Sequence, residues 1–433
     1  MAAGLSPQHR KWLQWLHILA GFASVQMVIQ ILGFLSGILI VRHLSKPDYA
    51  WFTIANALIA TLGMIADSGV SAGLSSIGGT IWQDGARFGS LIRTALTLRR
   101  KFALVTVILV TPIFIWLLVK NQAPAVTVAI VVAAALIGFS LQLTGGILGM
   151  VMSLRQEIRR MQLLGLSAAL ARLVLVASAC IVLIDLRVVV IIGVIGPGFQ
   201  LWFLRRWVRE AVNLNAPETP EYRDRLLTVV KKQLPLTLFY CLQGQVIVWL
   251  ISIFGSKERI AEIGALGRFA MIFTVVSSVM NGVVVPRFAR CQDLSLLRRR
   301  YWQIVAGFAA VAGALVILSA AFPRPLLWVL GGRYANLESE VWLMMLSAAL
   351  AALFATQFAL TYSKAWIAPA IISIPMEIVT QAVLIFLLDM TTVRGVLWLG
   401  CCSFIPPIFL NMIIAYVNLR KAPVSAEPRT GAV

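Results

Sequence analysis

The sequence predicts an all-α polytopic membrane protein that crosses the bilayer about twelve times, and three observations support this prediction. Of 433 residues, 60% are apolar and only 12% are charged, whereas soluble domains carry about 25% charged residues. The apolar residues fall into runs of about 20, the length that a helix needs to cross the hydrocarbon layer. The basic residues are also distributed unequally between the loops on the two sides.

Twelve apolar runs lie between charged or polar breaks. They are residues 18–41, 49–72, 102–120, 124–150, 163–185, 187–204, 233–254, 263–285, 303–322, 341–362, 367–388 and 395–417. A polar stretch with Pro217 and Pro220 separates the sixth run from the seventh. The sequence therefore predicts an N-terminal six-helix bundle at 1–212, a cytoplasmic linker at 213–232, a C-terminal six-helix bundle at 233–418 and a short cytoplasmic tail at 419–433.

The orientation follows from the positions of Lys and Arg. With the N-terminus in the cytoplasm, the inner segments hold 26 of the 37 basic residues, the outer loops hold 9, and two lie within runs. Cytoplasmic loops carry the excess of Lys and Arg in helical membrane proteins. Both termini are therefore expected in the cytoplasm, and the net charge of +20 reflects topology rather than a surface for nucleic acid.

Several function classes lose support from the same sequence. It contains no phosphate-binding loop of the form G-x-x-x-x-G-K-[ST], so any transport is not powered by an ATPase of its own. The five Cys and three His show no spacing typical of a zinc site or a disulfide framework, and we expect neither a metal nor a cofactor. Because the outer loops are short, an enzyme is disfavoured and no catalytic residue is expected.

Ionisable residues inside the runs are the first candidates for a functional site, because each costs about 2.5–3.5 kcal/mol to insert. Asp67, Arg172, Arg268 and Glu377 lie within runs, and Arg42 lies at the end of the first. Guanidinium groups offer a fork of donors that fits phosphate oxygens. We therefore expect Arg268, Arg42 and Arg172 to contact a phosphate group in a cavity.

Each of these residues also has a structural explanation. Arg42 can snorkel to the outer interface, and Arg172 can pair with Asp67 or Glu377. Asp67 precedes Ser68-Gly69, so it caps or kinks a helix or, alternatively, binds a coupling ion. For Glu377, a proton relay and an internal ion pair are equally open.

Uncharged residues add further candidates. Gln30 lies in the first run and Asn281 in the eighth. Both amides can hydrogen-bond a sugar, although bonds between helices are the commoner role of amides in membrane spans. The pairs Gly33/Gly37 and Gly145/Gly149 have the small-xxx-small spacing that permits close helix packing.

The stretch from Gly33 to Tyr49 ends in Val-Arg-His-Leu-Ser-Lys-Pro-Asp-Tyr. It resembles the first loop of the polysaccharide flippases (Wzx-type) in the multidrug/oligosaccharidyl-lipid/polysaccharide exporter (MOP) superfamily, which also contains the MATE transporters. Three later stretches resemble other parts of the same family: Asp67-Ser68-Gly69-Val70 in its second span, Ile263 to Arg268 with Val285 to Phe288 around its eighth, and Leu330-Gly331-Gly332-Arg333-Tyr334 in an outer loop.

The resemblance implies two six-helix bundles around a central cavity in the bacterial inner membrane. It also implies a flippase for undecaprenyl-diphosphate-linked oligosaccharide, an O-antigen or exopolysaccharide repeat unit, which alternates access between the leaflets. Arg268 matches a position where a basic residue is common in the family, and Arg42 is a motif residue. Arg172 and Glu377 match no motif. Expected partners are the lipid-linked oligosaccharide, membrane lipids, and possible polymerase and assembly proteins, with a coupling proton or sodium ion left open.

Three other functions remain open at this point. A MATE-like multidrug or cation antiporter of the same superfamily is the main alternative, because Asp67 and Glu377 are acidic residues of the kind that bind cations. A membrane enzyme such as an O-antigen polymerase is disfavoured by the short outer loops. A non-transporting assembly scaffold is the third.

Overall fold

The computed structural model describes residues 7–155, 157–182, 185–213, 216–280, 284–289, 291, 293–364, 366 and 370–420. These residues are helical along almost their whole length, and no strand occurs among them. Ten helices in this part of the chain are long and apolar enough to cross a membrane, and Gln243–Phe254 and Ile372–Leu387 are shorter apolar segments. These twelve elements correspond to the twelve predicted runs, so the predicted fold class is confirmed.

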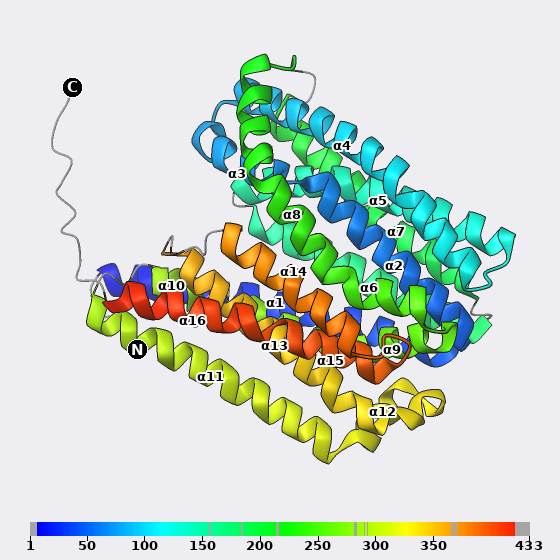
Figure 1. Cartoon of the computed structure of the whole chain (residues 1–433). Coiled ribbons are helices and arrows are strands. Elements are labelled where there is room, and N and C mark those ends of the chain that lie inside the picture. Colours follow the sequence, from blue (N-terminus) through cyan, green and yellow to red (C-terminus); the bar gives the residue numbers. More distant parts are fainter. Residues whose placement is uncertain are drawn as a thin grey trace, which may run out of the picture.

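Each half of the chain forms a helical bundle (Figure 1). The N-terminal half contains α1 (Pro7–His43), α2 (Lys46–Asp67), α3 (Val70–Ile81), α4 (Gly85–Lys120), α5 (Ala125–Leu154), α6 (Ile158–Val182) and α7 (Leu186–Ala211). The C-terminal half contains α8 (Pro220–Phe254), α9 (Lys257–Val279), α10 (Val285–Ala289), α11 (Leu294–Ala321), α12 (Pro323–Leu330), the 3₁₀ helix η2 (Gly332–Leu337), α13 (Glu338–Tyr362), α14 (Ala370–Leu387), α15 (Val393–Ser403) and α16 (Ile405–Arg420).

Two predicted spans are each divided into two helices. The second run breaks between α2 and α3, where Ser68 has φ 38° and Gly69 has φ 88°. Glycine adopts this left-handed conformation without the steric cost that a Cβ imposes, so the dipeptide ends α2 and allows α3 to start in a new direction. The last run breaks at Phe404, between α15 and α16, directly before the two prolines that cannot donate backbone hydrogen bonds to a continuous helix.

The second part of the expected linker is helical. Helix α8 begins at Pro220 and continues into the seventh apolar run without a break. Its first turns bury Leu226 and Val230 against the N-terminal half, where a Cβ on Gly73 would lie 2.8 Å from Leu226 Cδ2. The first turns of α8, which begins at Pro220, therefore pack against the N-terminal half.

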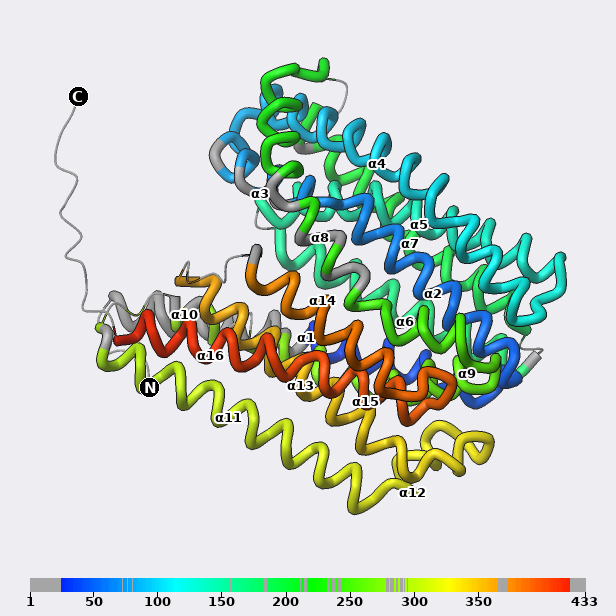
Figure 2. The backbone as a smooth tube through the Cα atoms, viewed as in Figure 1, coloured from blue at the N-terminus to red at the C-terminus, as the bar shows by residue number. Residues whose placement is uncertain are grey.

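The hydrophobic core is shared at one end of the molecule and divided at the other. One cluster contains residues of both halves, including Val41 and Tyr49 with Ile260 and Leu330. A second cluster joins α3, α4, α5 and α7 to the start of α8, and a third lies within the C-terminal half around Tyr301. Figure 2 shows α9 beside one end of α2, where helices of the two halves contact each other.

Hydrogen bonds also join the halves at the shared end, which we call the closed end. They are Lys46 Nζ to Glu262 Oε1, Tyr49 Oη to the Gly264 carbonyl, Arg42 Nη2 to the Trp328 carbonyl, Arg333 Nη1 to the Leu44 carbonyl, Asn121 Nδ2 to the Ser252 carbonyl and Lys257 Nζ to Gln122 Oε1. The sequence predicts these loops on the outer side of the membrane. With the orientation that the sequence predicts, the closed end faces the outer side of the membrane.

Candidate functional site

Arg268 lies on α9 at the junction of the two halves. Its Nε donates a hydrogen bond to Tyr49 Oη at 3.0 Å, and its guanidinium carbon lies 6.0 Å and 5.9 Å from the ring centroids of Tyr49 and Phe52. Tyr49 Oη in turn donates to the Gly264 carbonyl at 3.1 Å, one turn earlier on α9. Two aromatic side chains of α2 therefore contact Arg268. Both are neutral, so they do not neutralise its positive charge.

Local sequence explains why Tyr49 is available at this position. Ser45 caps α2, because its hydroxyl accepts from the Asp48 backbone N–H at 3.2 Å and donates to the Asp48 carboxylate at 2.6 Å. Lys46, in the first turn, pairs with Glu262 on α9 at 3.0 Å. The cap and the ion pair fix the start of α2 against α9, and the fully buried Tyr49 follows in the next positions.

Gly37 on α1 provides the space for the Arg268 side chain. A Cβ at this position would lie 3.1 Å from Arg268 Nη1 and 3.2 Å from its Cδ, closer than normal packing allows. A Cβ on Gly33, one turn earlier, would meet nothing within 4 Å. The Gly33/Gly37 pair therefore does not mark a close contact between two helix backbones, as its spacing predicted, but a place where one glycine accepts an arginine.

Arg172 on α6 is half-buried. Helix α1 packs against both α6 and α9, and Gly37 of α1 borders the Arg268 side chain. Among the residues that the structure describes, no carboxylate lies within ion-pair distance of Arg172 or Arg268. The two arginines thus lie on helices of opposite halves that flank α1, and no described carboxylate balances either charge.

Arg42 lies apart from this pair. Its Nη2 donates to the Trp328 carbonyl at 2.7 Å, and its guanidinium stacks over the Trp328 ring with 4.9 Å between the guanidinium carbon and the ring centroid. The residue is exposed at the end of α1. The structure thus places Arg42 in a contact between α1 and α12 at the closed end, and its role in phosphate binding stays a prediction.

Asp67 ends α2 and pairs with Arg99 of α4, with 3.3 Å between Oδ1 and Nη2. The same carboxylate oxygen accepts a hydrogen bond from the Ser71 hydroxyl. Arg99 is 8% exposed, and its Nε and Nη1 have no hydrogen-bond partner among the described residues. Asp67 therefore neutralises a buried arginine at the break between α2 and α3.

Glu377 on α14 is 2% exposed and accepts a hydrogen bond from Gln243 Nε2 of α8 at 2.7 Å. Of the partners considered for Arg172, Asp67 is thus engaged with Arg99 and Glu377 with an amide. Gln30 is half-buried on α1. Asn281 lies outside the described residues.

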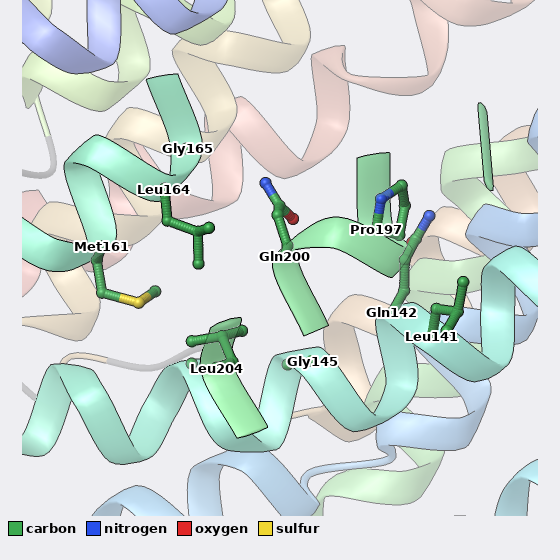
Figure 3. Close-up of a pocket in the computed structure, with 11 residues that line it drawn as sticks. Leu141, Gln142, Gly145, Met161, Leu164, Gly165, Pro197, Gln200 and Leu204 are labelled. Carbon is green, nitrogen blue, oxygen red and sulfur yellow. The ribbon is translucent and has the colours of Figure 1, made fainter. Parts of the chain in front are cut away.

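A pocket of about 380 Å³ lies between α5, α6 and α7 of the N-terminal half. Figure 3 shows its lining, with the Gln200 amide among the side chains of Leu164 and Leu204 and above Gly145. None of the predicted site residues lines this pocket. The Gly145/Gly149 pair, whose spacing predicts close helix packing, falls within the lining of this pocket. A Cβ on Gly145 would meet nothing within 4 Å.

Within the described residues, no group of three or more His, Cys, Asp and Glu side chains is arranged to hold a metal ion.

The chain was compared with known proteins. A scan against protein-family models found no match, and a search of curated protein sequences also found none. Solved structures do match. An inward-facing multidrug resistance MATE family transporter of the MOP superfamily has a TM-score of 0.68 and 13% identity, covering 92% of this chain and 100% of that one.

Two further structures belong to the same group. The lipid II flippase MurJ in an inward closed conformation has a TM-score of 0.69 and 12% identity, over 91% of this chain and 87% of that one. A MOP superfamily transporter from Pyrococcus furiosus, described as having a binding pocket of reverse polarity, has a TM-score of 0.54 and 14% identity, over 94% and 96%. At these identities the likeness shows the fold alone. The chain has the two-lobed helical fold of the MOP superfamily transporters.

Proposed function

We propose that this chain is a flippase that moves an undecaprenyl-diphosphate-linked oligosaccharide from the cytoplasmic to the periplasmic leaflet of the bacterial inner membrane by alternating access. The observation that carries the proposal is the position of Arg172 and Arg268, one in each half of the chain, on helices that both pack against α1. Neither forms an ion pair with a carboxylate among the described residues.

Positive charges inside a membrane protein are unfavourable unless an anion joins them, because burial disfavours the charged form. A diphosphate supplies oxygens on two neighbouring phosphorus atoms, and each guanidinium can bind oxygens through two parallel N–H groups. A site between the two halves also contacts both of the bodies that move in alternating access. This arrangement fits a diphosphate better than it fits a cation.

The acidic residues give less support to a cation antiporter. Asp67 forms an ion pair with Arg99, and its carboxylate also accepts a hydrogen bond from the Ser71 hydroxyl. Glu377 has only the Gln243 amide as a hydrogen-bond partner among the described residues, and this buried carboxylate is the one observation that favours a MATE-like antiporter as the second candidate. Glu377 is also the residue on which we would place a coupling proton or sodium ion.

The direction of transport is consistent with the state of the molecule. Hydrogen bonds and a shared apolar cluster close the end that the positive-inside rule places outside. A lipid-linked substrate on the cytoplasmic side would meet the protein in this state. Partners expected for such a flippase are a polysaccharide polymerase and other assembly proteins, which act on the product in the outer leaflet.

The test is the leaflet location of lipid-linked oligosaccharide in cells depleted of the protein and complemented with variants at equal expression. Arg268→Ala, Arg172→Ala and the double variant remove the guanidinium groups, and Arg268→Lys keeps the charge but removes the fork. Arg187→Ala is the matched control, because Arg187 is an exposed arginine beside Asp185.

We expect cytoplasmic accumulation after depletion, with Arg268→Lys rescuing delivery only partly and Arg187→Ala rescuing it fully. Normal delivery to the outer leaflet after depletion, in cells without a redundant transporter, would overturn the flippase. Loss of cation efflux in the Glu377→Gln variant with normal oligosaccharide delivery would instead support the antiporter.

A further inference from the structure

A second pocket of the N-terminal half, of about 430 Å³, lies between α4, α5 and α7. We call it the α4–α7 groove. It is lined by Arg100, Ala103, Leu104, Val107, Phe139, Ser140, Leu141, Leu143, Thr144, Leu201 and Arg205. The lining thus combines two basic residues with a mostly apolar surface, and it includes neither Arg172 nor Arg268.

The two arginines of the groove are available for an external anion. Arg100 and Arg205 are both exposed, and neither forms an ion pair with a described carboxylate. Two carboxylates are bound to this part of α4: Asp67 pairs with Arg99, and Glu218 accepts a hydrogen bond from the Thr97 hydroxyl at 2.6 Å, one turn before Arg100.

The depth of these arginines in the membrane follows from the sequence. The apolar run of α4 begins at residue 102, and that of α7 ends at residue 204, so both basic side chains leave the backbone at the inner headgroup level. Trp202 and Trp207 pack edge-on and tilted against Phe203 on the same stretch of α7. Aromatic rings gather at membrane interfaces, which supports the same level.

The apolar part of the groove opens toward lipid. Leu104, which lines it, is 64% exposed, and Val105 and Ile108 on the adjoining face of α4 are 56% and 63% exposed. In a membrane these side chains contact acyl chains. A ligand therefore enters the groove from the bilayer, with its charged part near the arginines and its apolar part among Ala103, Val107 and Leu143.

We propose that the α4–α7 groove binds an anionic phospholipid of the inner leaflet, with the phosphate between Arg100 and Arg205 and an acyl chain along the apolar lining. Basic pockets between membrane helices on the cytoplasmic side recognise anionic headgroups in this way. The site is separate from the arginine pair at the junction of the halves, so it does not depend on which substrate the protein carries.

The experiment measures lipid retention by the purified, delipidated full chain with native mass spectrometry during titration with phosphatidylglycerol or phosphatidylcholine. The test variant is Arg100→Gln with Arg205→Gln. The matched control is Lys101→Gln with Arg206→Gln, because these residues are the exposed neighbours on the same helices, carry the same charges and do not line the groove. Ser140→Phe fills the groove from an exposed position and leaves both arginines in place.

We expect the wild-type chain to retain phosphatidylglycerol in preference to phosphatidylcholine. The test variant should lose about thirtyfold in phosphatidylglycerol affinity, at about 1 kcal/mol for each of the two arginines. The control should change less than about twofold, because its side chains do not line the groove. Ser140→Phe should also reduce retention, and Arg172→Ala with Arg268→Ala should not. Inorganic phosphate should not displace the lipid.

Three results would overturn the proposal. Equal losses in the test and control variants would show that diffuse surface charge attracts the lipid. Unchanged retention in Ser140→Phe would show that no acyl chain occupies the groove. Displacement by inorganic phosphate at the lipid's own concentration would assign the arginines to a free anion.

Discussion

The buried ion pair between Asp67 and Arg99 yields a prediction in which the two single substitutions have unequal effects. Arg99 is 8% exposed, and two of its nitrogen atoms already lack partners among the described residues. The Asp67 side chain is 29% exposed, and its carboxylate has a second partner in the Ser71 hydroxyl. Substitution of the acid leaves a buried charge, whereas substitution of the base leaves a half-exposed one.

The magnitudes follow from this asymmetry. Removal of one partner from a fully buried pair costs about 3–5 kcal/mol. Because the Asp67 side chain is partly solvated, we expect Asp67→Asn to lower the free energy of unfolding by about 2–4 kcal/mol, slightly less than for a fully buried pair. Arg99→Gln should cost about 1 kcal/mol, since the carboxylate that remains keeps its hydroxyl donor and its contact with water. The double variant should be more stable than Asp67→Asn alone.

The measurement is the unfolding free energy of the four proteins in lipid–detergent bicelles, arranged as a double-mutant cycle. Transport activity of the double variant separates the two explanations of Asp67. Recovery of both stability and activity would assign it a structural role, whereas recovery of stability without activity would assign it to ion coupling. A smaller loss for Asp67→Asn than for Arg99→Gln would refute the reasoning from burial.

Three further substitutions test other contacts of the junction and the C-terminal half. Gly37→Val should displace Arg268 and reduce transport activity at least about tenfold, as a misplaced functional group does. Gly33→Val should have little effect, because its Cβ would meet nothing within 4 Å. Equal transport activities of the two variants would contradict this. Tyr49→Phe removes two hydrogen bonds and should lower the unfolding free energy by about 1–2 kcal/mol. The control is Tyr362→Phe, which should leave the unfolding free energy unchanged because Tyr362 is exposed. Glu377→Gln keeps an acceptor for the Gln243 amide and should lower the unfolding free energy by under about 1 kcal/mol. Glu377→Ala leaves that amide without its partner and should lower it by about 2 kcal/mol. A calorimetric comparison that ranks the two variants in the opposite order would reject this account.

Hydropathy predicted the number of spans because each apolar run has to match the thickness of the membrane. It did not predict where the helices begin. The third run starts at residue 102, but α4 starts at Gly85, because a helix can continue into water once polar side chains replace apolar ones. Arg99 therefore lies outside the predicted third run, and hydropathy does not identify it as the partner of Asp67.

Side-chain partners were the least predictable part of the site. Arg268 and Arg172 are candidates because a charge within a span is costly, and the structure places them on two helices that both pack against α1. The contact of Tyr49 with Arg268 depends on the packing of α2 against α9, and the two residues are separated by more than 200 positions. Such a pairing leaves no periodic pattern in one sequence, so neither hydropathy nor charge spacing can identify it.

The closed end determines how much free energy a ligand has to supply in alternating access. The Lys46–Glu262 pair is partly exposed, with side-chain exposures of 25% and 10%, and such pairs contribute about 0–1 kcal/mol. Five further hydrogen bonds across the closed end contribute about 1 kcal/mol each. Together these contacts are similar in size to the roughly 5.5 kcal/mol of differential affinity that inverts a 1:99 equilibrium, and the apolar cluster shared by the halves adds to the cost of opening.

Arg268 links that cost to the proposed substrate site. Its Nε is bound to Tyr49 Oη, and the same hydroxyl donates to the Gly264 carbonyl at the closed end. A phosphate that draws the guanidinium away from Tyr49 removes one of the contacts that hold α2 against α9, and does so only when the ligand is bound. Because a ligand shifts an equilibrium only by binding two states differently, an arginine that belongs to both the proposed anion site and the closed end would give a diphosphate the required difference. A drug cation gains no such difference from Arg268, since it is repelled by the guanidinium in either state.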